Sequence, residues 1–218
     1  MPIFTNSGLV MAMQSALAAP ITLTAISKAS SGVFTGTHSL VPGDFVLIKA
    51  QGMIEVDYRV LEVLSVSTTV SFQCVGPDGV TGLDTSNYTT FTSGTAEKIT
   101  FGTSITGVQG FTSSGGDIKF VGTTTVHDKR DKQIVVGANA LSYSLDLQWD
   151  PANLGQSEML KAFESRLSKA FRITWPSGAY ATWYGSVGYS GAPGGESQGV
   201  TTTNAAIALD GPMTVAGA

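Results

Sequence analysis

The sequence predicts a mainly β fold, an antiparallel β-sandwich or barrel with one packed α-helix, and three observations lead to this prediction. Charged residues make up only 13% of the 218 positions, about half the usual share, so hydroxyl groups must cover much of the surface. The chain contains 26 glycines, which help to break it into short apolar segments separated by turns. One good amphipathic helix is found in this β-like chain, just before a tight hairpin of aromatic strands.

Residues 20–98 are predicted to form a small all-β module near the N-terminus. Short β-like segments alternate there with turn signals such as VPGD, GPDG and TSGT; the segments are ITLTAI, DFVLIKA, YRVLEVLSV and VSFQCV. The only cysteine, Cys74, shares one face of its strand with Phe72, so we expect a buried structural thiol. Residues from SKASSGVF to LDTSNYTTFTSG resemble a small β module that recurs in virion tail proteins. The flanking residues 1–19 and 99–218 then form one larger, discontinuous domain.

The clearest strand of the larger domain is LSYSLDLQW, residues 141–149. Apolar and polar side chains alternate strictly along it, which predicts one buried and one solvated face. The apolar set is Leu141, Tyr143, Leu145, Leu147 and Trp149. Two more strands, residues 169–175 and 179–187, are joined by a Pro-Ser-Gly turn, and the final strand is predicted at residues 199–211.

A helix is predicted between these strands, directly after residue 153. Asn153 can cap it, and Gln156 three residues later makes the arrangement close to a capping box. Apolar side chains then recur at helical spacing and form one stripe, expected to be the helix-to-sheet core: Met159, Leu160, Phe163 and Leu167. Full burial of four large side chains contributes roughly 6–12 kcal/mol before entropy is counted. We therefore expect the helix to cover an apolar face of the sheet.

The composition and the motif search favour a structural protein over an enzyme or a nucleic-acid reader. A net charge of −4 has the wrong sign for binding phosphate. The histidines, His38 and His127, have no ligand at metal spacing beside them and are expected at the surface. The run GYSGA misses the last glycine of a serine-hydrolase elbow, and GAPGGESQG lacks the ending of a phosphate-binding loop. Asp146 and Asp150 are too far apart along a strand to act as paired carboxylates. No catalytic residue, cofactor or metal is expected.

The segment 123–140 stands out because it concentrates charge in a chain that has little. Five consecutive residues are charged: Asp128, Lys129, Arg130, Asp131 and Lys132. They could form a solvated hairpin tip. Mixed signs would also allow complementary pairing between identical subunits without net repulsion.

The order strand, helix, FRITWPSGAYATWYGSV, glycine-rich turn and threonine-rich strand resembles the tail tube protein of bacteriophages with long non-contractile tails. This resemblance covers roughly residues 99–215, and VMAMQSALAAPITLTAISKA is also similar to such proteins. It implies hexameric rings whose sheets join edge to edge and which stack into a hollow tube, the conduit for genome DNA. In that case the charged segment is the loop that reaches the adjacent ring. The edge strands, little blunted by charge or proline, would recruit neighbouring copies.

The same resemblance implies the partners and the location of the protein. Besides other copies of the chain, the partners are tail tip or initiator proteins, tail terminator proteins, and a tape measure protein in the lumen during assembly. DNA passes through without sequence-specific binding. The protein would be made in the host bacterial cytoplasm and reside in the virion tail, and no apolar run is long enough for membrane insertion.

A carbohydrate-binding β-sandwich of a phage tail tip or fibre is the alternative function, because Thr, Tyr and Trp also suit contacts with sugars. The tryptophans separate the two functions. Trp149, Trp175 and Trp183 all fall on apolar faces of predicted strands, which favours the core, whereas a lectin would expose at least one in a loop. An enzyme is the third class, and the motif search gives it no support.

Overall fold

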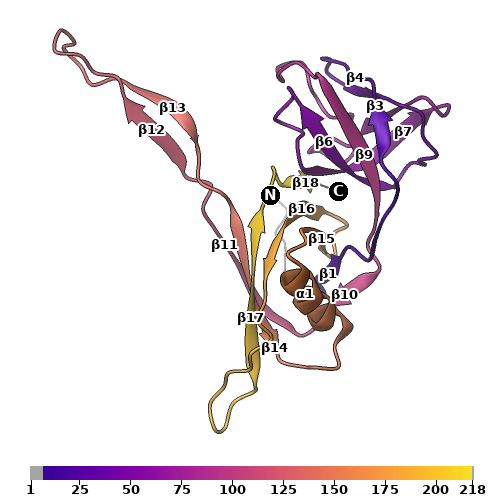
Figure 1. Cartoon of the computed structure of the whole chain (residues 1–218), viewed down its shortest axis with the longest axis vertical. Coiled ribbons are helices and arrows are strands. Elements are labelled where there is room, and N and C mark those ends of the chain that lie inside the picture. The colour runs from indigo at the N-terminus through magenta and orange to yellow at the C-terminus, as the bar shows by residue number, and fades with distance from the viewer. Residues whose placement is uncertain (1–6, 218) are drawn as a thin grey trace.

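A computed structural model describes residues 7–217, so residues 1–6 and 218 of the predicted larger domain lie outside the described residues. Within this range the chain forms 18 strands and one helix, and the mainly β prediction is confirmed. The strands make a large antiparallel sheet, a smaller closed sheet and a two-stranded ribbon that projects from the rest (Figure 1).

The large sheet has the strand order β10-β1-β15-β16-β17-β14-β11, and β18 pairs with the first part of β16. Its strands are β1 (Val10–Met13), β10 (Thr103–Ile105), β11 (Val108–Ser114), β14 (Ser142–Gln148), β15 (Lys169–Thr174), β16 (Tyr180–Gly188), β17 (Thr202–Leu209) and β18 (Thr214–Ala216). The predicted hairpin of β15 and β16 is confirmed, with Gly178 at φ 91° in its turn. The expectation that β17 is the last strand is wrong, because β18 follows it.

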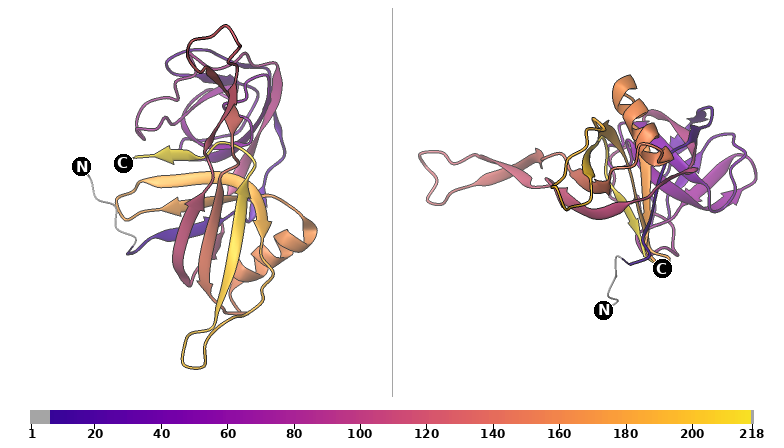
Figure 2. Two further views of the ribbon diagram at one scale, coloured as in Figure 1. Left: turned by 90° about the vertical axis from the view of Figure 1, so that its left-hand side faces the viewer. Right: turned by 90° about the horizontal axis from the view of Figure 1, so that it is seen from below.

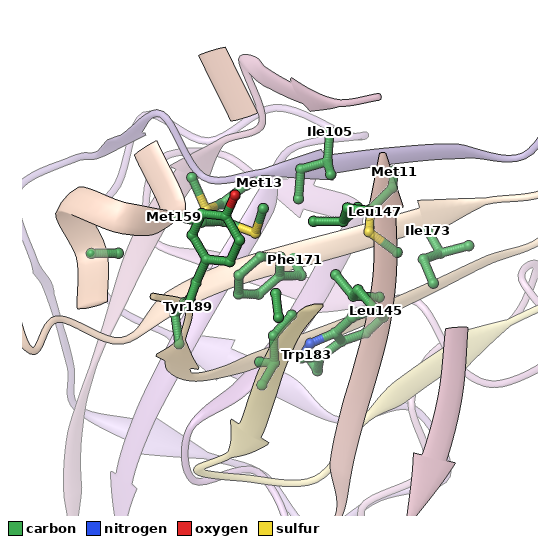
Figure 3. Close-up of a cluster of buried hydrophobic side chains, with 14 of the residues drawn as sticks. Met11, Met13, Ile105, Leu145, Leu147, Met159, Phe171, Ile173, Trp183 and Tyr189 are labelled. Carbon is green, nitrogen blue, oxygen red and sulfur yellow. The ribbon is translucent and has the colours of Figure 1, made fainter. Parts of the chain in front are cut away.

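The core of the large sheet lies between its concave face and helix α1 (Leu154–Ser165), as Figure 3 shows. Trp183 is fully buried between Tyr143 and Phe171, with ring centroids 4.7 and 6.0 Å away. Leu145 and Leu147 are buried beside it, which confirms the centre of the alternating strand at residues 141–149. This apolar cluster makes the strands converge on one hydrophobic core.

Helix α1 begins as predicted, because the Asn153 side chain accepts a hydrogen bond of 3.2 Å from the Gln156 backbone N–H. The Gln156 side chain does not return to the cap, as a capping box would. It is buried, donates to the Gln148 carbonyl at 2.6 Å, and accepts from the Asp150 N–H and the Tyr189 hydroxyl, both at 3.1 Å. The helix is thus tied to the ends of β14 and β16.

The predicted helix-to-sheet stripe is wrong in part. Met159 is fully buried and Leu160 packs against the core, but Phe163 is 44% exposed and Leu167 is 56% exposed. The buried helix face consists of Gly155, Gln156, Met159 and Ala162. A Cβ atom on Gly155 would lie 2.6 Å from the Ser104 carbonyl, so β10 approaches the helix closely there. This close approach and the hydrogen bonds of Gln156 set the rotation of the helix about its own axis. Phe163 is therefore left outside the core. The helix also ends before Leu167, at Arg166 with φ 54°.

The smaller sheet closes into a barrel around its own core. Its strands are β2 (Ala16–Leu17), β3 (Ile21–Leu23), β4 (Ala25–Ile26), β5 (Val33–Thr35), β6 (Phe45–Gln51), β7 (Arg59–Ser67), β8 (Ser71–Cys74) and β9 (Ser93–Thr100). Pairing runs from β3 through β9, β6, β7, β8 and β5 to β4. Because β3 and β4 are successive segments on either side of Thr24, this order returns to its start. The strands expected in the module at residues 20–98 are all present.

The barrel buries Cys74 as predicted, and burial raises the pKa of its thiol. The expected surface position of His38 is wrong, because the barrel leaves only 6% of it exposed. Its Nδ1 atom accepts a hydrogen bond of 3.1 Å from the Leu40 N–H, and its ring meets Phe72 edge-on.

The barrel packs on the convex face of the large sheet, over β15, the first part of β16 and β18. The Arg172 guanidinium lies 5.0 Å from the ring centroids of both Phe45 and Phe101. The Thr182 hydroxyl donates to the Val60 carbonyl at 3.0 Å. A third apolar cluster fills this contact: Phe45, Leu47, Val60, Ile99 and Ala170. The barrel therefore has a core of its own and a second, smaller contact with the sheet.

We expect Met159→Ala to lower the free energy of unfolding by about 2–5 kcal/mol, because it empties a fully buried site between helix and sheet. Phe163→Ala, a larger truncation one turn later, should cost less than about 1 kcal/mol in the unassembled subunit, because the ring is half-exposed. Chemical denaturation of the two variants measures both values. Equal losses would show that the helix packs through its predicted stripe after all.

Candidate assembly surfaces

The projecting ribbon consists of β12 (Ile118–Gly122) and β13 (Gln133–Ala138), which in the described part of the chain pair only with each other (Figure 1). Every residue of both strands is exposed. Several of these residues are large and apolar, with exposed fractions of 48–62%: Ile118, Phe120, Val121, Ile134, Val135 and Val136. The charged residues of this segment were expected from the sequence, whereas these apolar residues were not. Two short apolar stretches on either side of a polar turn, IKFV and IVV, indicate these apolar residues in the sequence.

All five predicted charged residues lie at the tip of the ribbon, between β12 and β13 (Figure 2). Asp128 folds the tip: its carboxylate accepts hydrogen bonds of 2.9 Å from the Thr125 backbone N–H and hydroxyl, and it pairs with Lys132. The hydrogen bond from Lys132, followed by those from Thr125, holds the pKa of Asp128 below its ordinary value. No ion pair to Lys129 or Arg130 occurs among the described residues. Those two cations are therefore free to meet another molecule.

Part of the convex face of the large sheet is covered by neither the barrel nor the helix. The register of β11, β14 and β17 places small and polar side chains there, and we call this set the open face: Gly110, Thr112, Ser114, Ser142, Ser144, Asp146, Gln148, Thr202, Asn204, Ala206 and Ala208. It contains one carboxylate and no basic residue. Asp146 is exposed on it and Asp150 is exposed beyond the end of β14, so both are solvated as expected.

Among residues 7–217, β10 and β11 are the unpaired edge strands at the two ends of the large sheet. β11 has the sequence VQGFTSS, with no charge and no proline to discourage pairing with another chain. A groove of about 530 Å³ separates the two edges and is lined by Leu9, Val10, Met11, Ile105, Val108 and Phe111 among others. This side of the sheet offers backbone groups and apolar surface together.

A second groove, of about 470 Å³, lies at the end of helix α1. Its apolar lining is Phe163, Leu167 and Val187, and its polar lining is Glu164, Arg166 and Ser186. The residues that do not pack inside the subunit thus form a surface of their own, and they remain available for contact with another copy.

The sequence motifs that were set aside as catalytic lie in loops, where the Ser190 hydroxyl accepts a hydrogen bond of 3.4 Å from the Ala192 N–H. Ser190 and the glycine-rich run 191–199 lie in the loop between β16 and β17, and His127 is exposed at the ribbon tip. Among residues 7–217, no three His, Cys, Asp or Glu side chains are placed to hold a metal ion. In the same range, no helix is long and apolar enough to cross a membrane.

The tryptophans do not all lie in the core, contrary to expectation. Trp183 is fully buried and Trp175 packs partly against the core, but Trp149 is 37% exposed just beyond β14. Its indole N–H donates to the Gly191 carbonyl at 3.1 Å, which holds the ring against the β16–β17 loop. Tryptophan burial alone therefore does not separate a tail tube subunit from a carbohydrate-binding protein.

Comparison with protein families distinguishes the tail tube subunit from the carbohydrate-binding protein. Residues 51–218 match the family described as phage tail tube protein, TTP. The match starts in β6 and continues through the rest of the barrel, the ribbon and the large sheet, so it reaches further than the resemblance over residues 99–215. No curated protein matches the chain. Because the matched region covers most of the 218 residues, the chain belongs to the phage tail tube protein family.

Proposed function

We propose that this protein assembles into hexameric rings that stack into the hollow tail tube of a bacteriophage, the conduit through which genome DNA is ejected. The observation that carries the proposal is a large sheet with unpaired, unprotected edges beside a smooth polar face. Edge strands of this kind recruit further strands. Joined edge to edge, six such sheets would close into one barrel and remove every edge.

We place the open face toward the lumen. Duplex DNA carries one negative charge per about 1.7 Å of its axis, and lysines or arginines on the wall would hold it with a strong, salt-dependent attraction. The open face has Asp146 as its single charged group and otherwise carries uncharged side chains, most of them short. Such a wall lets DNA slide. The barrel, on the other part of the same convex face, would lie outside the luminal wall and decorate the tube.

The ribbon is the element we assign to contacts between rings. Its tip carries Lys129 and Arg130 without an intramolecular ion pair, while Asp128 and Lys132 keep the turn folded. The further partners follow from a tube of this kind: an initiator or tip complex at one end, a terminator at the other, and a tape measure protein inside during assembly.

Electron microscopy of the purified chain tests the proposal directly. We expect rings or tubes of one width, either spontaneously or after an initiator complex from the same tail is added. Particles of variable width, or a subunit that stays monomeric even with the initiator complex, would refute it.

We expect replacement of residues 128–132 by Gly and Ser to abolish tubes while the melting temperature of the free subunit stays within a few degrees. An exposed ion pair contributes about 0–1 kcal/mol, but about 0.5 kcal/mol per ribbon over six ribbons sums to about 3 kcal/mol, more than a hundredfold in association. Higher salt should weaken stacking of the unmodified chain.

The double variant Lys129→Ser with Arg130→Ser is the matched test, since it keeps the Asp128–Lys132 pair that folds the tip. This double variant should also fail to form tubes. Normal tubes from either variant would show that the tip charges take no part in stacking.

We expect lysines on the open face to make the lumen retain DNA. Thr112→Lys combined with Ala208→Lys adds two cations on β11 and β17, on either side of β14, without disturbing the core. Tubes assembled with short duplex DNA should then hold it in a nuclease-resistant form at low salt and release it at high salt. A control lysine at the exposed barrel residue Val80 should bind DNA only in a nuclease-sensitive form. Nuclease-sensitive DNA in both variants would place the open face outside the lumen.

A further inference from the structure

The ribbon is apolar on both of its faces, which the strand register makes plain. Phe120 pairs with Val135, and the next pair along, Val121 with Ile134, points to the opposite side. All four side chains are large and between 48% and 62% exposed. A ribbon that lies on a single surface has one buried face and one solvent-exposed face, and apolar and polar residues alternate along its strands. Apolar and polar residues do not alternate in this way along β12 and β13.

Within residues 7–217, the subunit covers neither face. The ribbon extends away from both the barrel and the large sheet in Figure 1 and in the right-hand view of Figure 2. An isolated two-stranded ribbon is marginally stable in water, and a contiguous exposed apolar patch indicates an interaction site. Both apolar faces therefore need a partner from outside the subunit.

The charges of the chain indicate that this partner is another copy. Residues 117–138 contain four basic and three acidic side chains, a net charge of +1. Because the whole chain carries −4, the remainder carries −5. A basic arm on an acidic body is complementary to the body of an identical molecule. Such a contact joins different surfaces of the two copies, so it propagates along an assembly rather than closing a dimer.

We propose that each ribbon is inserted between two other copies of this chain, so that Phe120 and Val135 contact one copy and Val121 and Ile134 contact the other. This inference rests on the proposed tube, and it makes each ribbon a junction of three subunits. The tip charges then act at the end of an arm that is held mainly by apolar burial.

Thiol labelling tests the insertion one face at a time. The single native cysteine, Cys74, is fully buried and its thiol pKa is raised by burial, so it gives little background. Val135→Cys reports on one face and Val121→Cys on the other. A maleimide probe should label both rapidly in the free subunit, and both at least tenfold more slowly in assembled tubes. Val80→Cys, on an exposed barrel turn, is the reference and should react at the same rate in both states.

A second measurement does not depend on labelling. The paired variants Phe120→Ser with Val135→Ser, and Val121→Ser with Ile134→Ser, each remove one apolar face. Each should lower the yield of tubes at least tenfold, with little change in the melting temperature of the free subunit, because these residues are about half exposed and belong to none of its core clusters.

The possible outcomes separate this inference from the function on which it rests. Tubes in which only one face is protected, or in which only one paired variant matters, overturn the insertion but leave the tube intact. Tubes with both faces labelled at the free rate overturn it as well. If the unmodified chain forms no tubes under any condition, the proposed function fails and the insertion fails with it.

Discussion

The large sheet is wider than the elements that cover it, and the rest of the structure depends on this constraint. Its concave face is closed by helix α1 around Trp183, and the barrel covers one part of its convex face. What remains is the open face, the unpaired edges at β10 and β11, and the apolar surface at the end of the helix. In a monomeric protein these would be liabilities for aggregation. In the proposed tail tube they are the surfaces that meet other copies of the chain.

The chain separates the residues that fold the subunit from those that face outward. Gly155 and Gln156 fix the helix against β10, β14 and the end of β16 through close approach and hydrogen bonds, so few large side chains are needed there. Phe163 and Leu167 are thereby left outside the subunit core. The ribbon shows the same division: Asp128 folds the tip through Thr125 and Lys132, while the apolar side chains of β12 and β13 contribute nothing to the core. Stability of the subunit and stability of the assembly can then be altered independently.

Several features followed from local sequence because short-range physical chemistry decides them. Strict alternation identified the face that carries Leu145 and Leu147. A proline and a glycine at fixed positions gave the turn between β15 and β16. An asparagine before the helical window gave the N-cap, and an alternating strand gave the burial of Cys74. In each case the pattern that predicts the feature spans only a few positions of the chain.

The sequence by itself thus determined the β class, the single helix, most strand positions and the buried face of the alternating strands, while only the tertiary structure decided the rotation of the helix, the surroundings of His38 and Trp149, and the exposure of the ribbon. Helical spacing identified a stripe through Phe163, but contacts of Gly155 and Gln156 with distant strands set the rotation of the helix. His38 is buried because the barrel closes around it, and Trp149 is exposed because β14 ends before it. The two apolar faces of the ribbon appear only once β12 and β13 are paired in register. Periodicity shows which residues share a face, but contacts between segments far apart in the chain determine what that face meets.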